Sequence, residues 1–134
     1  MMSDDAASLR VLVVDDNEDI RHLLVLTVER MGHHADQAAD GVAAVEALGV
    51  GRYDVMLLDL TMPRMTGEDV LRWLREQPSS AAGLRVVVIS AYAGALVETL
   101  KELGAYAVLT KPIGMQELRE VLDETPAPRG GVDE

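Results

Sequence analysis

The sequence predicts one α/β domain, a (βα)5 doubly wound fold with helices on both faces of a five-stranded parallel sheet. Three observations lead to this fold class. The chain has 134 residues, the size of one ordinary domain. Short apolar runs without polar alternation are typical of strands buried on both faces. Helical periodicity fills the stretches between them, so strand and helix alternate five times, as in a parallel sheet with right-handed crossovers.

Five strands are expected in this pattern. The clearest are residues 9–14, 55–58 and 84–89, which are rich in Val, Leu and Ile. Weaker strands are expected at 33–38 and 105–109.

Five helices are expected between and after these strands. Apolar residues recur at intervals of three and four over 20–31, 42–48, 70–74, 96–103 and 115–122. Four of these helices are followed by a residue that does not continue a helix, namely Gly32, Gly49, Pro78 and Gly104.

The composition restricts the class of protein. The chain is 49% hydrophobic and has no cysteine, which excludes disulfides and thiolate metal sites. Its net charge of −11 argues against direct binding of nucleic acid and against membrane-surface binding. The start of the chain has neither the basic segment nor the apolar run of a secretory signal, and no apolar stretch is long enough to span a bilayer. A cytoplasmic location is the expectation.

The two ends differ from the middle of the chain. Residues 1–8 are expected to form a flexible N-terminal arm, and residues 9–124 the domain itself. Residues 125–134 contain Pro and Gly without periodicity, which is typical of a disordered tail or a linker stub.

Polar side chains follow four of the predicted strands. Asp15 and Asp16 follow the first, Asp59 the third, Ser90 the fourth and Lys111 the fifth. Ligands of an open parallel sheet bind beyond the carboxyl ends of its strands, so these groups are expected to converge there.

Two interpretations of the three acids are open. They can be separate solvated loop acids or helix caps, as Asp16 or Asn17 would be for the first helix. They can instead form a Mg2+ site, because a hard divalent cation takes oxygen ligands and would offset the repulsion between carboxylates. Two different strands supply the acids and a third supplies a lysine, which favours a Mg2+ site beside a carboxylate nucleophile.

Four motifs, in this order, resemble the receiver domain of bacterial response regulators over about residues 9–123. They are residues 11–17 (Val-Leu-Val-Val-Asp-Asp-Asn), residues 57–63 leading to Gly67, residues 88–91 (Val-Ile-Ser-Ala), and residues 104–112 ending in Lys-Pro. The resemblance implies a flavodoxin-like fold with strand order 2-1-3-4-5. It also implies a signalling module of a two-component phosphorelay, not an enzyme with a separate substrate.

The resemblance assigns a role to each site residue. Asp59 is implied as the phosphoacceptor, with Asp15, Asp16, Asp59 and the backbone carbonyl of Thr61 as ligands of Mg2+, for which Mn2+ can substitute. Ser90 and Lys111 would bind the phosphoryl group. A cis peptide bond at Pro112 would aim the lysine.

One position departs from the family pattern. The family usually places an aromatic residue three positions before the lysine, where this chain has Val108. Tyr106 lies two residues earlier, on the same face of the expected strand, too far along it to substitute. Our hypothesis is that Tyr92 or the helix at 96–103 reports phosphorylation instead, and that Tyr92 also modulates the lifetime of the phosphoryl group.

The sequence also bears on three other functions. A haloacid-dehalogenase phosphatase needs a second Asp where this chain has Thr61, and a flavin carrier would place a phosphate where Asp15 and Asp16 would repel it. A degenerate receiver acting as a phosphorylation-independent docking module is the remaining alternative, because of Val108.

The resemblance also implies partners. A histidine kinase or a histidine phosphotransfer protein would supply the phosphoryl group, docking near the first helix. A downstream protein would bind the face formed by residues 96–122, which could also mediate a homodimer. His33 and His34 are expected to be surface residues.

Overall fold

Five parallel strands form the predicted sheet. The computed structural model describes residues 8–91 and 94–125. The strand order is β2-β1-β3-β4-β5, which confirms the fold class and the order expected from the resemblance. The strands are β1 (Arg10–Val14), β2 (His34–Ala38), β3 (Val55–Asp59), β4 (Arg85–Ser90) and β5 (Ala107–Thr110).

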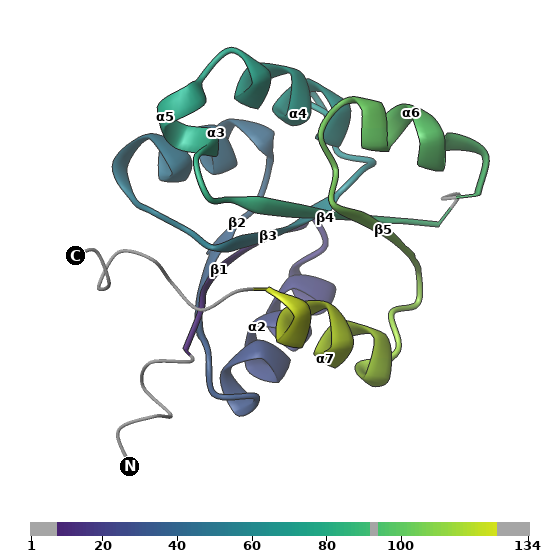
Figure 1. Cartoon of the computed structure of the whole chain (residues 1–134). Helices are drawn as coiled ribbons and strands as arrows, with labels where there is room; N and C mark the ends of the chain where they lie inside the picture. The colour runs from purple at the N-terminus through teal and green to yellow at the C-terminus, as the bar shows by residue number, and fades with distance from the viewer. Residues whose placement is uncertain (1–7, 92–93, 126–134) are drawn as a thin grey trace.

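Helices cover both faces of this sheet. Figure 1 shows α2 and α7 on one face, and α3, α4, α5 and α6 on the other. Their bounds are α2 (Glu18–Arg30), α3 (Gly41–Val50), α4 (Gly67–Arg75), α5 (Pro78–Ala81), α6 (Val97–Glu102) and α7 (Met115–Glu124), with a 3-10 turn, η1 (Gly94–Leu96), ahead of α6. None of the helices in these two described ranges has the length and apolarity that a membrane crossing requires.

Two apolar cores hold the layers together. Successive side chains of a strand point to opposite faces, so β1 sends Leu12 and Val14 into one core and Val11 and Val13 into the other. All four side chains are buried. Because both β1 and the neighbouring β3 are covered on their two faces, their carboxyl ends are held side by side.

Helix starts follow the local sequence. Asn17 caps α2 by accepting a hydrogen bond from the amide of Ile20, at 3.0 Å. Thr66 and Asp69 form a reciprocal capping box at the start of α4. The C-terminal glycine predicted after the first helix, Gly32, has a φ of +97°, a conformation that favours glycine.

The structure differs from the sequence-based expectations in several elements. The helix α5 was not expected, and it begins at Pro78 because proline suits the first position of a helix. The helix expected at 42–48 runs on through Gly49 to Val50. The strand expected from residue 105 begins at Ala107, because the Ala105 amide still bonds to the Leu100 carbonyl of α6.

Two single residues also differ from expectation. His34 is exposed as expected, but His33 is partly buried and its Nδ1 accepts a hydrogen bond from the Leu9 amide at 3.0 Å. Tyr106 precedes β5, and its hydroxyl group reaches Glu124 at the end of α7. Val108 packs instead in the core on the other face, so the two residues do not share a face. The arm, the tail and Tyr92 lie outside the described residues, apart from Ser8 and Thr125 at their edges.

Candidate phosphoacceptor and metal site

Three carboxylates meet at the carboxyl ends of two neighbouring strands. Asp59 is the last residue of β3, and Asp15 directly follows β1, the strand next to it in the sheet. Both are almost fully buried, whereas Asp16 is exposed. One carboxylate oxygen from each of the three acids lies within 4.8 Å of the others. The structure therefore brings together the three acids predicted from strand ends.

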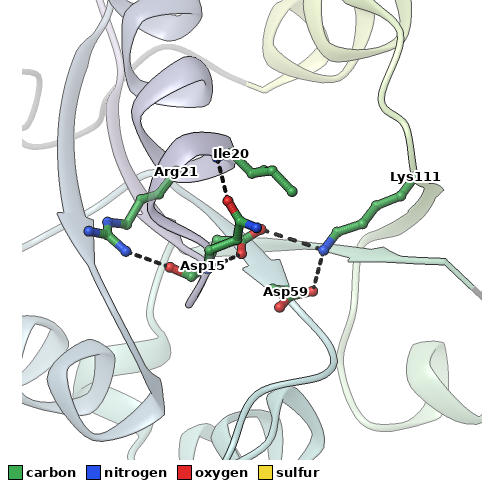
Figure 2. A network of polar contacts seen from close by, with 6 residues as sticks. Asp15, Ile20, Arg21, Asp59 and Lys111 are labelled. Carbon is green, nitrogen blue, oxygen red and sulfur yellow. Dashed lines mark hydrogen bonds and ion pairs between the residues drawn. The ribbon is translucent and has the colours of Figure 1, made fainter.

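Lys111 joins these acids from the end of β5. Its Nζ lies 3.0 Å from Asp59 Oδ1 and 3.6 Å from Asp15 Oδ2, as Figure 2 shows. Its backbone amide donates to the carbonyl of Ser90 at 3.0 Å, which ties β5 to the end of β4. The Lys111–Pro112 peptide bond is cis. One cation thus faces three carboxylates.

This charge imbalance is reflected in two pKa values. Burial raises the pKa of Asp59, and the negative charges of Asp15 and Asp16 act in the same direction, against the opposing effect of Lys111. Burial alone would lower the pKa of Lys111, but its hydrogen bond to Asp59 and the charges of Asp59 and Asp15 outweigh burial and raise it. A negative group that is costly to keep charged and a firmly protonated lysine are therefore in contact.

One oxygen of Asp15 has no hydrogen-bond partner. Asp15 Oδ1 accepts from the Asn17 amide at 2.9 Å, whereas Oδ2 is buried without a hydrogen bond. Its ion pair with Lys111 Nζ, at 3.6 Å, is too long for a hydrogen bond. Buried polar atoms nearly always form hydrogen bonds, so a buried carboxylate oxygen that forms none requires an explanation. A bound cation provides one, and three carboxylates without Cys or His offer the hard oxygen donors that Mg2+ prefers. These residues fit a divalent cation.

A tightly packed loop follows β3. A side chain at Gly67 would place its Cβ 2.8 Å from the Asp59 carbonyl oxygen and 2.9 Å from Leu60 Cα, so only glycine fits. The Gly67 amide donates to the Leu60 carbonyl at 3.0 Å. In the middle of the loop, Arg64 pairs with Asp40, the cap of α3, at 3.1 Å. The loop is thereby closed between its two ends and fixed in its middle.

The remaining predicted residues have less direct relations to the acids. Ser90 is buried at the end of β4. Thr61 lies in the loop after β3, with an exposed side chain. Val108 is partly buried and packs against the same core as Leu96 and Leu103. Tyr92 is among the residues that the structure does not describe.

Sequence reasoning missed one residue beside the site. The guanidinium of Arg21 donates through one terminal nitrogen to the backbone carbonyl of Asp15, at 2.9 Å. Its Nε donates to Gln37 Oε1 at 2.8 Å. Arg21 lies one turn into α2, and no side-chain motif reveals a contact that is made to a backbone oxygen.

The family model for the response regulator receiver domain matches residues 11–123. Sporulation initiation phosphotransferase F of Bacillus subtilis is 32% identical over 114 residues, which covers 84% of this chain and 90% of that protein. The chain spans only 47% of the length of the mycobacterial response regulators MprA that it also matches.

Solved structures resemble the fold as well. The chemotaxis protein CheY4 of Vibrio cholerae aligns with a TM-score of 0.81 at 28% identity, covering 89% of this chain and 99% of that one. The receiver domain of the sensor histidine kinase PA1611 from Pseudomonas aeruginosa, which has a magnesium ion coordinated in its active site cleft, aligns with a TM-score of 0.78 at 26% identity. That alignment covers 87% of this chain and 95% of the other.

The buried acids at strand ends, the lysine facing them and the doubly wound sheet define a phosphoacceptor module. The chain belongs to the response regulator receiver family of two-component systems.

Proposed function

We propose that this chain accepts a phosphoryl group on Asp59 from the phosphohistidine of a histidine kinase or a phosphotransfer protein. The observation that carries the proposal is the contact of Asp59 with Lys111, beside a buried oxygen of Asp15 that forms no hydrogen bond. Acids arranged only for solubility would be solvated, whereas Asp15 and Asp59 are buried next to a third acid, Asp16.

Each site residue has a task in this proposal. Asp15, Asp16, Asp59 and the Thr61 carbonyl hold Mg2+ or Mn2+, which when bound offsets negative charge on the phosphoryl oxygens. Lys111, already 3.0 Å from Asp59, stabilises the same oxygens from the side of β5. The magnesium ion in the receiver domain of PA1611 supports this assignment.

The transfer itself requires little covalent chemistry from the protein. A carboxylate oxygen of Asp59 forms a P–O bond as the P–N bond of the donor phosphohistidine breaks, and the released imidazole takes up a proton. The packed loop at Gly67 holds the acceptor carboxylate in position for this attack.

Phosphorylation then changes the surface that the downstream partner recognises. Ser90 donates its hydroxyl group to the phosphoryl oxygens, which moves the chain that follows β4. Val108 is partly buried against the same core as Leu96 and Leu103, so a displacement of the 3-10 turn and α6 can follow without an aromatic switch. Tyr92, which lies outside the described residues, modulates the phosphoryl lifetime in this proposal.

The partners bind two separate surfaces. Leu23 and Leu26 are 61% and 52% exposed on α2, an apolar surface suited to the phosphodonor protein. The face formed by α6, β5 and α7 binds the downstream protein or a second copy of the chain. In this proposal residues 9–124 act in the cytoplasm as the receiver.

A second candidate function is a degenerate receiver that docks without being phosphorylated. The specific observation in its favour is Val108, an aliphatic residue packed against the core at the position where the family usually has an aromatic residue. The complete set of acids and the ion pair of Lys111 favour phosphorylation instead.

Intact-mass measurement after incubation with acetyl phosphate and Mg2+ tests the proposal. We expect a gain of one phosphoryl group, abolished by EDTA and by Asp59→Asn. Asp19→Asn, which alters an exposed acid in the first turn of α2, is the matched control and should still be phosphorylated. Magnesium binding without any phosphorylation, by acetyl phosphate or by histidine kinases, would favour the docking module.

A further inference from the structure

A single peptide bond links Asp15 and Asp16, the two adjacent acids of the proposed metal site. The carbonyl of Asp15 belongs to the peptide group that links Asp15 to Asp16, so its orientation sets the direction of both side chains. Asp15 stands beyond the end of β1, and its amide, which donates to the Ala38 carbonyl at 3.3 Å, belongs to the preceding peptide. Among the described residues, no backbone hydrogen bond of the sheet holds the Asp15–Asp16 peptide itself.

Arg21 supplies the missing restraint. Its terminal nitrogen donates to the Asp15 carbonyl at 2.9 Å, and Figure 2 shows the side chain reaching that oxygen from α2, on the side of Asp15 away from Lys111. The second donor of the same guanidinium, Nε, holds Gln37 on β2 at 2.8 Å. One planar group thus connects α2, the end of β1 and the edge strand, which a lysine cannot do with a single ammonium.

The other contacts of Asp15 depend on the same peptide. Asn17 donates its amide to Asp15 Oδ1 at 2.9 Å and accepts through its side chain from Ile20, at 3.0 Å. With Oδ1 held, Oδ2 points toward Lys111 and the other acids. A rotation of the Asp15–Asp16 peptide would turn Oδ2 out of this position.

We propose that Arg21 is a positioning residue of the phosphoacceptor site, which clamps the Asp15–Asp16 peptide and so sets the affinity of the acids for a divalent cation. The inference rests on the proposed function. It concerns Arg21 and Gln37, neither of which contacts the acceptor carboxylate in the residues described.

The direction in which Mg2+ affinity changes when Arg21 is removed distinguishes a positioning role from a purely electrostatic one. A cation near three carboxylates competes with Mg2+, so if Arg21 acted only through its charge, removing it would tighten Mg2+ binding. If Arg21 acts by positioning, removing it weakens Mg2+ binding, and partners of metal ligands commonly account for about tenfold or more in affinity.

The experiment is calorimetric titration of Mg2+ into the whole chain and its variants. We expect about tenfold weaker binding in Arg21→Ala, a smaller loss in Gln37→Ala, which leaves the bond to Asp15, and partial recovery in Arg21→Lys. Arg30→Ala, which removes an exposed arginine from the last turn of the same helix, should bind like the unaltered chain. Unchanged or tighter binding in Arg21→Ala would overturn the proposal.

A second readout needs no metal. Amide hydrogen exchange of Asp15 and Asn17, followed by NMR in EDTA, should be several-fold faster in Arg21→Ala, while Val13 within β1 is unaffected. If Arg21→Ala does not fold, the same measurements on Arg21→Lys and Gln37→Ala decide, and no change in either overturns the clamp. If the unaltered chain binds no Mg2+, the proposed function fails, and the exchange rates alone decide whether Arg21 holds the peptide.

Discussion

The two ends of the sheet treat charge in opposite ways. At the carboxyl ends, three carboxylates face Lys111, and Asp15 Oδ2 is buried without a hydrogen bond. Near the amino ends, Asp36 accepts from the Tyr53 hydroxyl at 2.7 Å and pairs with Arg10 at 3.6 Å. At the carboxyl end one lysine therefore faces three acids, whereas Asp36 alone has two partners near the amino end.

A second network at the amino end follows the same rule. The Tyr106 hydroxyl donates to Glu124 at 2.8 Å, and the guanidinium of Arg85 lies 4.1 Å from the centre of the Tyr106 ring. Arg85 also donates to the backbone carbonyl of Glu124, at 3.1 Å. These contacts join β4, β5 and α7. The comparison indicates that the contacts at the amino end stabilise the fold, whereas the unbalanced negative charge at the carboxyl end lowers the free energy of unfolding.

The largest effect that would test this comparison is stabilisation of the fold by Mg2+. Mg2+ at a hundred times its Kd should raise the free energy of unfolding by about 2.7 kcal/mol, because it binds only the folded site. Urea unfolding with MgCl2, against NaCl of equal ionic strength, measures it. The same gain in Asp15→Asn would show that Mg2+ binds elsewhere.

The second largest effect concerns the packing around the backbone of Asp59. Gly67→Ala should lower the free energy of unfolding by about 2 kcal/mol, since overpacking against backbone usually costs 1–3, and should slow phosphorylation of Asp59. The contacts at 2.8 and 2.9 Å are with backbone atoms, which cannot move aside as a side chain can.

Gly49→Ala is the matched control for this substitution. It lies within α3 with nothing within 4 Å of the added Cβ, so it should stabilise the protein by about 0.5–1 kcal/mol through helix propensity. Equal unfolding free energies for the two variants in urea would contradict the packing argument.

The same chemical change at the two ends should have opposite signs. Asp59→Asn removes a buried negative charge that is repelled by Asp15 and Asp16 and attracted by Lys111. In the absence of Mg2+ we expect the lost repulsion to exceed the lost attraction, which should raise the free energy of unfolding by about 1 kcal/mol. Asp36→Asn weakens partly exposed pairs and should cost about 0.5 kcal/mol. Urea midpoints of both variants at pH 7 in EDTA measure this, and a loss of stability in Asp59→Asn would contradict the comparison.

The carboxyl end was predictable from the sequence because a simple rule places it. Buried strands are recognisable as apolar runs, and parallel strands bring their following residues to one edge, so Asp15, Asp59 and Lys111 could be placed together without knowing any side-chain contact. The order of the strands came from the resemblance, not from periodicity.

The amino end and Arg21 could not be predicted in the same way. The pairing of Tyr53 with Asp36, or of Tyr106 with Glu124, depends on how far long side chains reach between segments distant in sequence. Arg21 bonds to a backbone oxygen, which any residue at position 15 would offer. Such contacts follow from the packed structure and leave no pattern in the sequence.

The smallest effect expected is a pH dependence at the amino end. Burial lowers the pKa of His33 below its usual 6.5, although the negative charges of Asp123 and Asp54 oppose the shift. The Leu9 amide donates to His33 Nδ1 at 3.0 Å, and only a neutral ring has a lone pair there. Below pH 6.5 the unfolded chain therefore takes up a proton more readily than the folded one, so this contribution is complete above pH 6.5 and declines as the pH falls further.

Urea midpoints between pH 7.5 and 5.5 measure this contribution, taken as the difference between the unaltered chain and His33→Asn. The Oδ1 of asparagine can accept from the Leu9 amide but does not titrate, so the variant should lose less stability than the unaltered chain over this range. Subtracting the two curves also removes the titration of Asp59, whose raised pKa acts alike in both proteins. Parallel curves would mean that His33 is protonated as easily in the folded chain as in the unfolded one. The amino end would then tolerate a charge without a partner, which is the property we assign to the carboxyl end alone.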